Sequence, residues 1–316
     1  MTNQLKLSEQ QLFTTPAWIV NTALLSGLIA ISFGAIFIRW SEDELSPIAT
    51  VFNRFWLGSF FFGLWHCGLA IRHWWSGKPV QQQPYTQKEI LLLLGAGTFF
   101  AFSLVLVAWS LTQTSVAIST VLHNLAPIFT SLGVWLLFSV GFNSQFLIGM
   151  IVAIGGAIAI ELDSLLLGAN TSILGDVAAT VSAVFLAAYL LCVEQLRTKF
   201  TPMTIQLWIC ACATVVMFPI VVLSGDKFFP STVGGWLVVI SFSVVCQVLG
   251  HGLLIYSLKR FSSVVISLFH LLEPVLSGIF ALAIFAEKLS FSDWIGFAFV
   301  LIGLYLAVSS QMDVNS

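Results

Sequence analysis

Long apolar segments alternate with short polar ones along almost the whole chain. Ten of these segments approach or exceed the length of about 20 residues that a helix needs to cross a membrane. They lie at residues 18–39, 49–71, 90–111, 115–139, 146–163, 175–194, 203–224, 235–257, 262–286 and 292–310. Apolar side chains occupy all faces of each segment, which excludes the alternation of a β-barrel and the one-sided pattern of a surface helix. The pattern predicts an all-α polytopic membrane protein with ten transmembrane helices.

The composition agrees with this pattern. Of the 316 residues, 58% are hydrophobic and 8% are charged, whereas soluble domains carry about 25% charged residues. So little charge excludes a soluble enzyme, a disordered chain and a nucleic-acid-binding protein with a basic face. The five cysteines lie in apolar segments without the spacing of a metal site, so we expect free thiols, no metal and no cofactor.

Positive charges along the chain predict its orientation. With the N-terminus inside, the inner side receives Lys6, Arg72, Lys78, Lys88, Arg197, Lys199, Lys259 and Arg260, and the outer side receives Arg39, Lys227 and Lys288. An excess of Lys and Arg marks the cytoplasmic side of a membrane. We therefore expect residues 1–16 and 311–316 to be cytoplasmic tails. The loops between spans are too short to hold a soluble catalytic domain.

The two halves of the chain match each other at an offset of 147 residues, which pairs segment 108–133 with segment 255–280. The paired positions include Ser110 and Ser257, Ser115 and Ser262, His123 and His270, Pro127 and Pro274, Gly149 and Gly296, and Gly156 and Gly303. Each half holds five spans, and five is odd, so the second copy enters the membrane from the opposite side. The sequence thus predicts two inverted five-helix repeats, at residues 17–165 and 166–310, an arrangement typical of transporters.

The end of the second half, LFHLLEPVLSGIFALAIFAEKLSFSDWIGFAFVLIGLYLAV at 268–308, resembles the last two helices of EamA-type permeases in the drug/metabolite transporter superfamily. The Ala286-Glu287-Lys288-Leu289 segment and the Leu174-Gly175-Asp176 start of the second half also fit. Val140 departs from the pattern, because family members often carry Glu there. The resemblance implies a carrier of the bacterial inner membrane, with a small-molecule substrate and the lipid bilayer as its partners.

Ionisable side chains inside spans are the sharpest candidates for a transport site, because an unpaired charge at the bilayer centre costs at least about 2.5–3.5 kcal/mol. Glu273 is expected to contact a substrate amine or to carry a proton. His270 shares its helix face at a spacing of three, and His123 is its partner in the repeat. A proton shared there makes protons the candidate coupling ion. The alternative is structural: a buried acid that aids packing, and histidines that bond to a carbonyl, Ser or Thr of an adjacent helix.

Other span residues have weaker claims on a site. Arg54 either contacts an anionic substrate group, or reaches the headgroups or pairs with the acids at 42–44. Pro127 and Pro274 are candidate hinges, because proline frees the carbonyl four residues earlier, and the alternative is a static kink. The remaining cavity candidates, which interhelical hydrogen bonding explains nearly as well, are Asn124, Trp109, Tyr256 and Tyr189.

The leading functional hypothesis is a secondary active exporter of a small metabolite or amino acid, since the chain has no ATP-binding motif. An intramembrane enzyme needs convergent catalytic groups, and the GxSxG and HExxH patterns are absent. A receptor or scaffold without solute flux is a further alternative. A nucleotide-sugar or phosphate-ester carrier needs several membrane-embedded cations, and the spans supply only Arg54.

Overall fold

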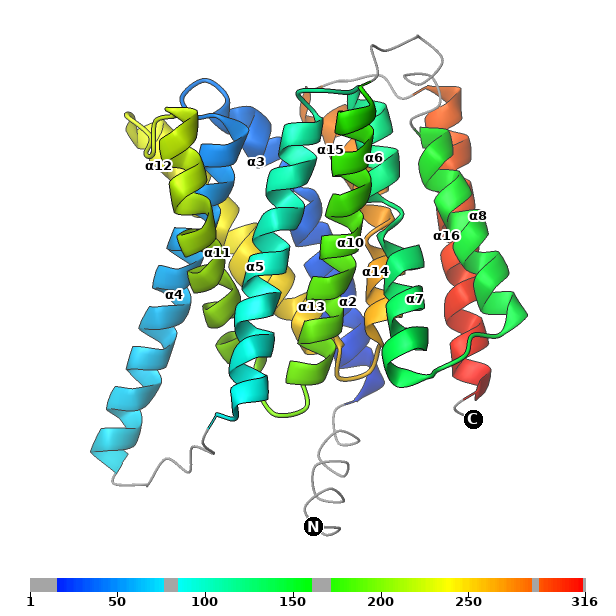
Figure 1. Ribbon diagram of the computed structural model, residues 1–316, viewed down its shortest axis with the longest axis horizontal. Helices are drawn as coiled ribbons and strands as arrows, with labels where there is room; N and C mark the ends of the chain where they lie inside the picture. Colours follow the sequence, from blue (N-terminus) through cyan, green and yellow to red (C-terminus); the bar gives the residue numbers. More distant parts are fainter. Residues whose placement is uncertain (1–15, 77–84, 161–171, 286–289, 315–316) are drawn as a thin grey trace.

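The computed structural model of the protein describes residues 16–76, 85–160, 172–285 and 290–314 as a bundle of helices joined by short connections (Figure 1). Within those ranges the chain contains no β-strand. The expectations for the tail at 1–15, for Lys78, for the junction of the two repeats at 165–166 and for the Glu287-Lys288 pair fall outside the described residues. The start of α2 and the end of α16 lie at the same end of the bundle (Figure 1).

Helices from the first half of the chain come first. They are α2 (Ala17–Ser32), α3 (Gly34–Ser41), α4 (Pro47–Ser76), α5 (Gln87–Ser110), α6 (Val116–His123), α7 (Ala126–Phe138) and α8 (Ser144–Ile160). The second half supplies α10 (Ile173–Leu196), α11 (Pro202–Ser224), α12 (Val233–Phe242), the π-helix η1 (Ser243–His251), α13 (Gly252–Ser257), α14 (Ser263–Phe269), α15 (Leu272–Phe285) and α16 (Phe291–Val314).

Eight segments of the described chain are long and apolar enough to cross a membrane. They are Ala17–Ser41, Gln87–Ser110, Ile118–Phe138, Ile173–Leu196, Pro202–Ser224, Val233–Ser257, Ser263–Phe285 and Phe291–Ser310. The two other expected spans correspond to α4, a 30-residue helix that contains Asn53, Arg54 and His66, and to α8, an apolar helix of 17 residues. Both pack within the same bundle, and α4 extends beyond it at one end (Figure 1).

Four of the expected spans are interrupted, although their hydropathy is continuous. The first breaks between α2 and α3, where the hydroxyl of Ser277 on α15 donates a 2.7 Å hydrogen bond to the carbonyl of Ser32. A neighbouring helix thus supplies a hydrogen bond at the point where the helix ladder is interrupted. The eighth span passes through the π-helix η1, and the fourth and ninth break at 124–125 and 270–271. Hydropathy reports the length of a span but not the continuity of its hydrogen bonds.

The breaks in the fourth and ninth spans occupy almost equivalent positions in the two halves. The helix before each break begins with a serine N-cap: Ser115 accepts from the Ile118 N–H at 3.2 Å, and Ser262 accepts from the Val265 N–H at 3.4 Å. The helix after each break has proline in its first turn, where a missing N–H needs no partner. The same sequence pattern therefore gives the same local structure twice.

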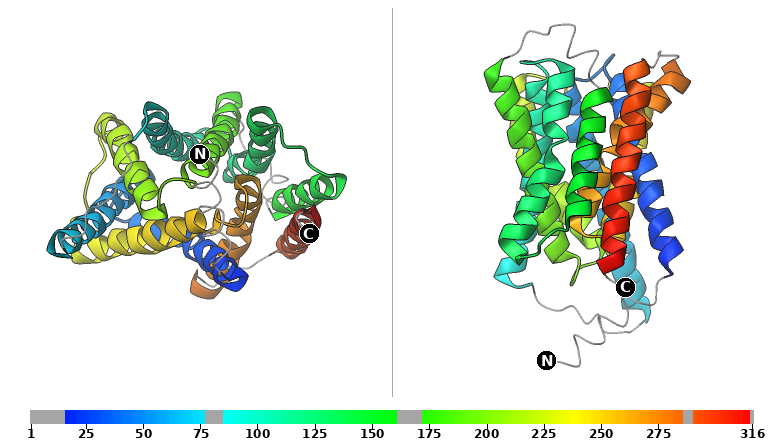
Figure 2. Two further views of the ribbon diagram at one scale, coloured as in Figure 1. Left: turned by 90° about the horizontal axis from the view of Figure 1, so that it is seen from below. Right: turned by 90° about the vertical axis from the view of Figure 1, so that its right-hand side faces the viewer.

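Helices of one half pack against helices of the other. The pairs include α8 with α16, the most extensive, and α5 with α10, α4 with α11, α5 with α11, α7 with α10, α6 with α10, α2 with η1 and α13, and α7 with α14. The α8–α16 pair lies at one edge of the bundle (Figure 2). A Cβ atom at Gly156 would lie 2.7 Å from the carbonyl oxygen of Gly296, and one at Gly149 would lie 2.7 Å from that of Gly303. The paired glycines therefore let the two backbones touch, as expected for a packing face.

Candidate functional site

Arg54 on α4 lies inside the bundle with only 8% of its surface exposed. Its Nε donates a 2.8 Å hydrogen bond to Oε1 of Gln247, and its Nη2 lies 3.1 Å from Nδ1 of His251. The Gln247 amide in turn donates to Oε1 of Gln206 on α11 at 2.9 Å. A network of polar side chains therefore joins α4 of the first half to α11 and η1 of the second. Arg54 does not pair with the acids at 42–44, the structural alternative considered above.

Aromatic rings surround the Arg54 guanidinium. Its Cζ lies 5.1 Å from the ring centroid of Phe242, 5.7 Å from that of Phe55 and 6.0 Å from that of Phe100. Phe100 also stacks on Tyr189 at a centroid distance of 4.5 Å. Ring faces stabilise a cation by their quadrupole and exclude water from it. Tyr189, expected near a cavity, thus lies in the wall next to Arg54.

Glu273 and the two histidines of the repeat lie close enough to interact by charge. Nδ1 of His270 is 3.5 Å from Oε2 of Glu273, and the Glu273 side chain is 43% exposed. Glu273 also interacts electrostatically with His123 on α6 and with Arg54. His251 completes the group through its interactions with Arg54 and His270. The structure therefore brings four of the expected site residues together.

His123 has a structural partner as well. Its Nδ1 lies 2.7 Å from Oγ of Ser182 on α10, and that hydroxyl donates to the carbonyl of Ala179 at 2.6 Å. Because a hydroxyl has one hydrogen, Nδ1 of His123 is the donor and Nε2 is left as an acceptor. This bond to a serine of an adjacent helix is the structural alternative considered for His123.

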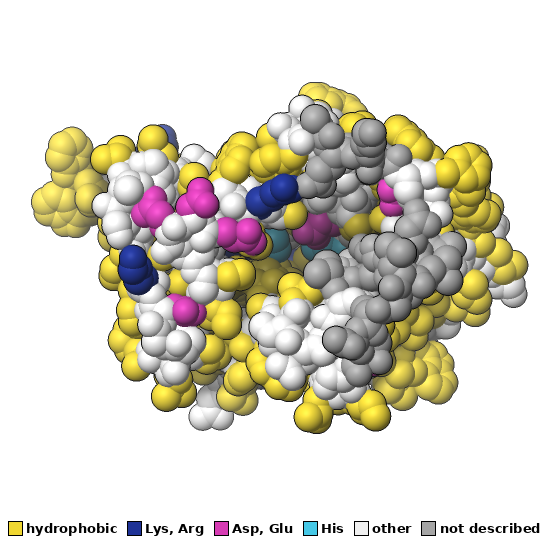
Figure 3. All heavy atoms as spheres, turned by 90° about the horizontal axis from the view of Figure 1, so that it is seen from above, with side chains coloured by type: hydrophobic (Ala, Val, Ile, Leu, Met, Phe, Trp, Pro, Cys, Tyr) yellow, Lys and Arg dark blue, Asp and Glu magenta, His cyan; other side chains and the backbone are white. Residues whose placement is uncertain are grey.

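A hollow opens at the end of the bundle that carries the connections 42–46 and 225–232. Seen from that end, histidine and acidic side chains are visible inside it (Figure 3). Both the start of α2 and the end of α16 lie at the opposite end of the bundle (Figure 1). Some of the ionisable side chains of the interior are therefore visible from this face of the molecule.

The other candidates divide between the interior and the ends. Asn124 lies in the break after α6, and its buried Nδ2 has no hydrogen-bond partner among the described residues. Trp109 is one residue from the end of α5 and 42% exposed. Tyr256 lies under Nζ of Lys259, 4.4 Å from its ring centroid, near the end of α13. Trp109 and Tyr256 occupy equivalent positions in the repeat, and both lie near the end of a helix.

The prolines differ from expectation in one detail. Pro127 is buried in the first turn of α7, and Pro274 lies in the first turn of α15. The carbonyl of His270, expected to be free, accepts a 2.9 Å hydrogen bond from the Glu273 N–H. Because proline has no N–H to donate, the chain ends one helix before it and starts a new one, with a tighter turn between the two segments.

The sequence analysis did not identify Gln206, Gln247 and His251. The two η1 side chains stand four apart, so a polar face in an apolar span was available as a signal. Nδ1 of His251 also lies 3.0 Å from the carbonyl of Cys246, five residues earlier. Such single π-helical turns occur frequently at functional sites. Within the described chain, no three His, Cys, Asp or Glu side chains are grouped so as to hold a metal ion.

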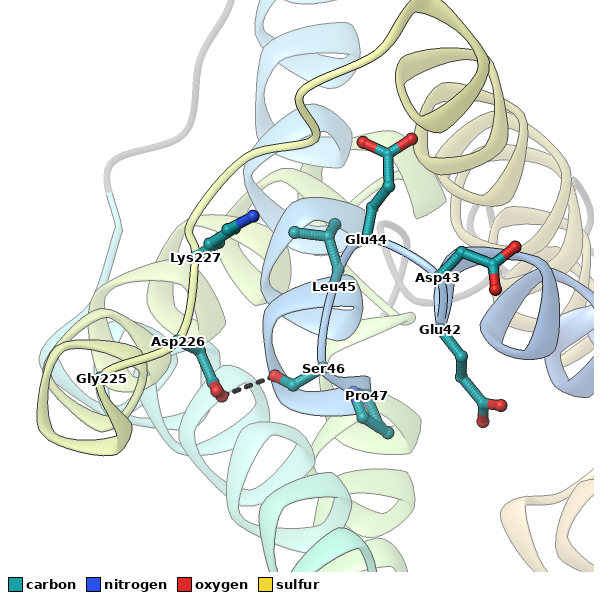
Figure 4. A pocket seen from close by; sticks show the side chains of 9 residues that line it. All are labelled: Glu42, Asp43, Glu44, Leu45, Ser46, Pro47, Gly225, Asp226 and Lys227. Carbon is teal, nitrogen blue, oxygen red and sulfur yellow. Dashed lines mark hydrogen bonds between the residues drawn. The ribbon is translucent and has the colours of Figure 1, made fainter.

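A separate pocket of about 480 Å³ lies at the rim of the same end, between the connections 42–47 and 225–227 (Figure 4). Ser46 donates a 2.5 Å hydrogen bond to Asp226 there. Glu44 accepts hydrogen bonds from the Thr232 hydroxyl and from the N–H groups of Ser231 and Thr232. These bonds, the Thr232 hydroxyl first, lower the pKa of Glu44. Thr232 is also the N-cap of α12, so the acids of this rim join the two halves of the chain.

Comparison with known proteins places the whole chain in one family. The sequence model of the EamA-like transporter family matches residues 18–162 and again residues 173–309. A relative from Archaeoglobus fulgidus, described as an uncharacterized transporter, is 26% identical over 284 residues, which cover 87% of this chain and 92% of the relative. These matches confirm the resemblance that the sequence indicated.

A solved crystal structure, described only as that of a protein, has a similar arrangement. It superposes with a TM-score of 0.73 at 16% sequence identity, and the match covers 93% of this chain and 98% of the other. At that identity the similarity shows a shared fold alone.

Proposed function

The chain belongs to the EamA-like transporter family, and on that premise we propose that it is a secondary active transporter that exports a small organic metabolite, such as an amino acid. The single observation that carries the proposal is that both halves of the chain contribute ionisable side chains to the interior of the apolar bundle: Arg54 of the first half is 8% exposed, and His270 of the second half lies 3.5 Å from Glu273. Charged groups are costly inside a membrane and usually mark a substrate or ion pathway.

Alternating access between two inverted repeats is the proposed mechanism. If a two-fold axis exchanges the halves, the second, fourth and fifth spans can each pack against their counterparts, the seventh, ninth and tenth. The same axis turns a contact between the third and sixth spans into a contact between the eighth and first. The packing of α4 with α11, α7 with α14, α8 with α16, α5 with α10, and α2 with η1 and α13 matches this set. The matching of the family model to two successive segments supports the same duplication.

The breaks in the fourth and ninth spans support a transport site between the halves. Discontinuous helices line the substrate and ion sites of many transporters, because broken backbone is tolerated only where it borders a cavity or protein. His123 ends α6, His270 lies in the break between α14 and α15, and Glu273 lies in the first turn of α15. In this proposal the breaks are the hinges about which the halves move.

Protons are the proposed coupling ion. The titratable and charged groups around Glu273 are His270, His123, Arg54 and Cys246, and Arg39 of α3 lies over the Phe285 ring at the other end of α15. A proton taken up at Glu273 changes the net charge of this group of side chains. The proposal places α4 and α8 in the membrane as the second and fifth of ten spans, with both termini in the cytoplasm of a bacterial cell.

A flux screen tests the proposed function. Labelled amino acids and other metabolites are loaded into proteoliposomes that contain the full chain, with and without a pH gradient. We expect at least one solute to cross faster than in protein-free liposomes, at a rate that the gradient changes. Absence of flux for every solute would contradict the proposal and favour a receptor or scaffold.

A further inference from the structure

The network around Arg54 contains more hydrogen-bond donors than acceptors. Nε2 of Gln206 is buried and has no hydrogen-bond partner in the described part of the chain. Nη1 of Arg54 also makes no hydrogen bond there, although it is not among the fully buried atoms. Gln247 links the two side chains, because its Oε1 accepts from Arg54 and its Nε2 donates to Gln206. A buried donor without an acceptor is costly, so its presence calls for an explanation.

His251 does not remove this excess. Its Nδ1 lies 3.1 Å from Nη2 of Arg54 and 3.0 Å from the carbonyl of Cys246. One ring nitrogen cannot accept from the guanidinium and donate to the carbonyl at the same time. If Nδ1 donates to the carbonyl of Cys246, the acceptor left for Nη2 of Arg54 is Nε2 of His251, at a long 3.5 Å. An added acceptor at the guanidinium would give Nη1 a partner and Nη2 a closer one.

The charge of Arg54 is equally unbalanced. A guanidinium is always protonated in proteins, yet in the described part of the chain no carboxylate lies within ion-pair distance of Arg54. Glu273 is its acidic neighbour, and it interacts only through space. The rings of Phe55, Phe100 and Phe242 surround the guanidinium, which belongs to a side chain with 8% of its surface exposed. A desolvated cation with an open pair of donors is a site for an anion.

We propose that Arg54, with Gln206, Gln247 and His251, forms the subsite that binds the carboxylate group of the transported solute. This inference rests on the proposed function, because it names the chemical class that the transporter recognises. The two oxygens of a carboxylate match the two terminal nitrogens of the guanidinium. Gln247 holds Nε and so fixes the plane of the guanidinium, and Gln206 supplies a further donor. Arg54 and His251 keep 8% and 7% of their surface exposed, whereas both glutamines keep none, so the anion meets Arg54 and His251 first.

The site fits a carboxylate better than a phosphate ester. A phosphate dianion needs more than one cation, and Arg54 is the one buried Lys or Arg side chain in the described part of the chain. A monovalent carboxylate balances the single guanidinium charge. The solute of this transporter is therefore an organic acid or an amino acid rather than a neutral metabolite or a phosphate ester.

Ligand-dependent thermal stability of the purified full chain in detergent tests this subsite. The probes are matched pairs of acids and their neutral amides: lactate with lactamide, succinate with succinamide, and N-acetylalanine with its amide, together with glycerol 3-phosphate. At constant ionic strength we expect at least one acid to raise the melting temperature more than its amide, since a ligand that binds the folded state stabilises it. Equal effects of acid and amide in every pair, or a larger effect of glycerol 3-phosphate, would overturn the proposal.

Variants separate binding from folding. Gln247→Glu keeps the size of the side chain and gives Arg54 an internal carboxylate, so the protein stays folded while the apparent affinity for the acid falls at least about tenfold. Gln145→Glu makes the same change on the exposed surface of α8 and leaves the affinity unchanged. Arg54→Lys keeps the positive charge but loses the two parallel donors of the guanidinium. We expect it to retain more affinity for the acid than Arg54→Met. An unchanged affinity in Gln247→Glu would sink the assignment.

The flux screen distinguishes this inference from the proposed function. Transport of neutral solutes alone, unaltered by Gln247→Glu, would contradict the carboxylate subsite and leave the transporter intact. Stabilisation by an acid that depends on Arg54, with no flux of any solute, would support the subsite and contradict transport.

Discussion

The guanidinium of Arg54 donates a 2.8 Å hydrogen bond to the side chain of Gln247, which lies 193 positions later in the chain. This one bond joins the first half of the protein to the π-helix of the second. Movement of the halves relative to each other therefore changes the surroundings of the only cation that the described part of the interior contains. The same bond gives the buried guanidinium of α4 a partner on another helix, without which a charge inside the bundle is costly.

Substitution of Glu273 by Gln tests proton coupling. The amide keeps the shape of the side chain and removes its titration, so we expect flux in proteoliposomes to lose its dependence on the pH gradient. Melting temperature in detergent should remain close to that of the parent, because Glu273 is 43% exposed and makes only a 3.5 Å contact with His270. Glu42→Gln, in an exposed connection, is the control. A pH profile identical to that of the parent would remove Glu273 from the coupling mechanism.

Substitution by alanine is expected to affect stability differently at two adjacent glycines of α8, because only one of them faces α16. Both Gly155→Ala and Gly156→Ala improve helix propensity equally. A Cβ at position 156 would lie 2.5 Å from the backbone nitrogen of Val300, whereas one at position 155 meets nothing within 4 Å. We expect Gly156→Ala to destabilise by about 1–3 kcal/mol through overpacking, measured as a lower melting temperature. Equal melting temperatures for the two variants would contradict the close backbone contact.

A third prediction concerns the contribution to stability of the hydrogen bond at the break between α2 and α3. Ser277→Ala removes the hydroxyl that donates to the carbonyl of Ser32. Loss of this interhelical bond should cost about 0.5–1.5 kcal/mol of stability. Ser59→Ala is the control, because Ser59 donates only within its own helix, to the carbonyl of Phe55. Chemical denaturation of both variants measures the difference, and a smaller loss for Ser277→Ala than for Ser59→Ala would count against the bond's role.

The rim acid Glu44 makes stability depend on pH. Hydrogen bonds from Thr232 and from the Ser231 and Thr232 backbone lower the pKa of Glu44 below its ordinary value of 4.5. A carboxylate with a lowered pKa adds stability at pH values above the unfolded pKa, and this contribution is lost as the pH falls through the folded pKa.

Glu44→Gln should therefore lower the melting temperature at neutral pH and leave it nearly unchanged in strong acid. Glu42→Gln, two residues earlier and exposed, is expected to show little change across the same range. The melting temperatures of the three proteins from pH 7 downward measure the effect. A difference between Glu44→Gln and the parent that grows as the pH falls would contradict the assigned hydrogen bonds.

Much of the architecture followed from local pattern. The apolar segments predicted the helices, and the offset of 147 residues predicted that His123 and His270, each beside a break, would share a local structure. The glycines of α8 and α16 have the spacing of seven that keeps both on one face of a helix, and these faces form the contact between the two helices. The spacing of three between His270 and Glu273 puts them on one helix face, and their side chains lie 3.5 Å apart.

The sequence by itself determined the class of protein, its helical segments and its membership of a transporter family, because hydropathy, helix period and repeats are properties of neighbouring residues. Only the tertiary structure decided what those segments do with their few polar groups. The sequence left Arg54 three possible partners, which were an anionic substrate group, the headgroups and the acids at 42–44. The fold places it beside Gln247 and His251. The reason is physical: inside a membrane protein every polar side chain must find its partner on another helix, and which helix that is depends on packing between distant parts of the chain.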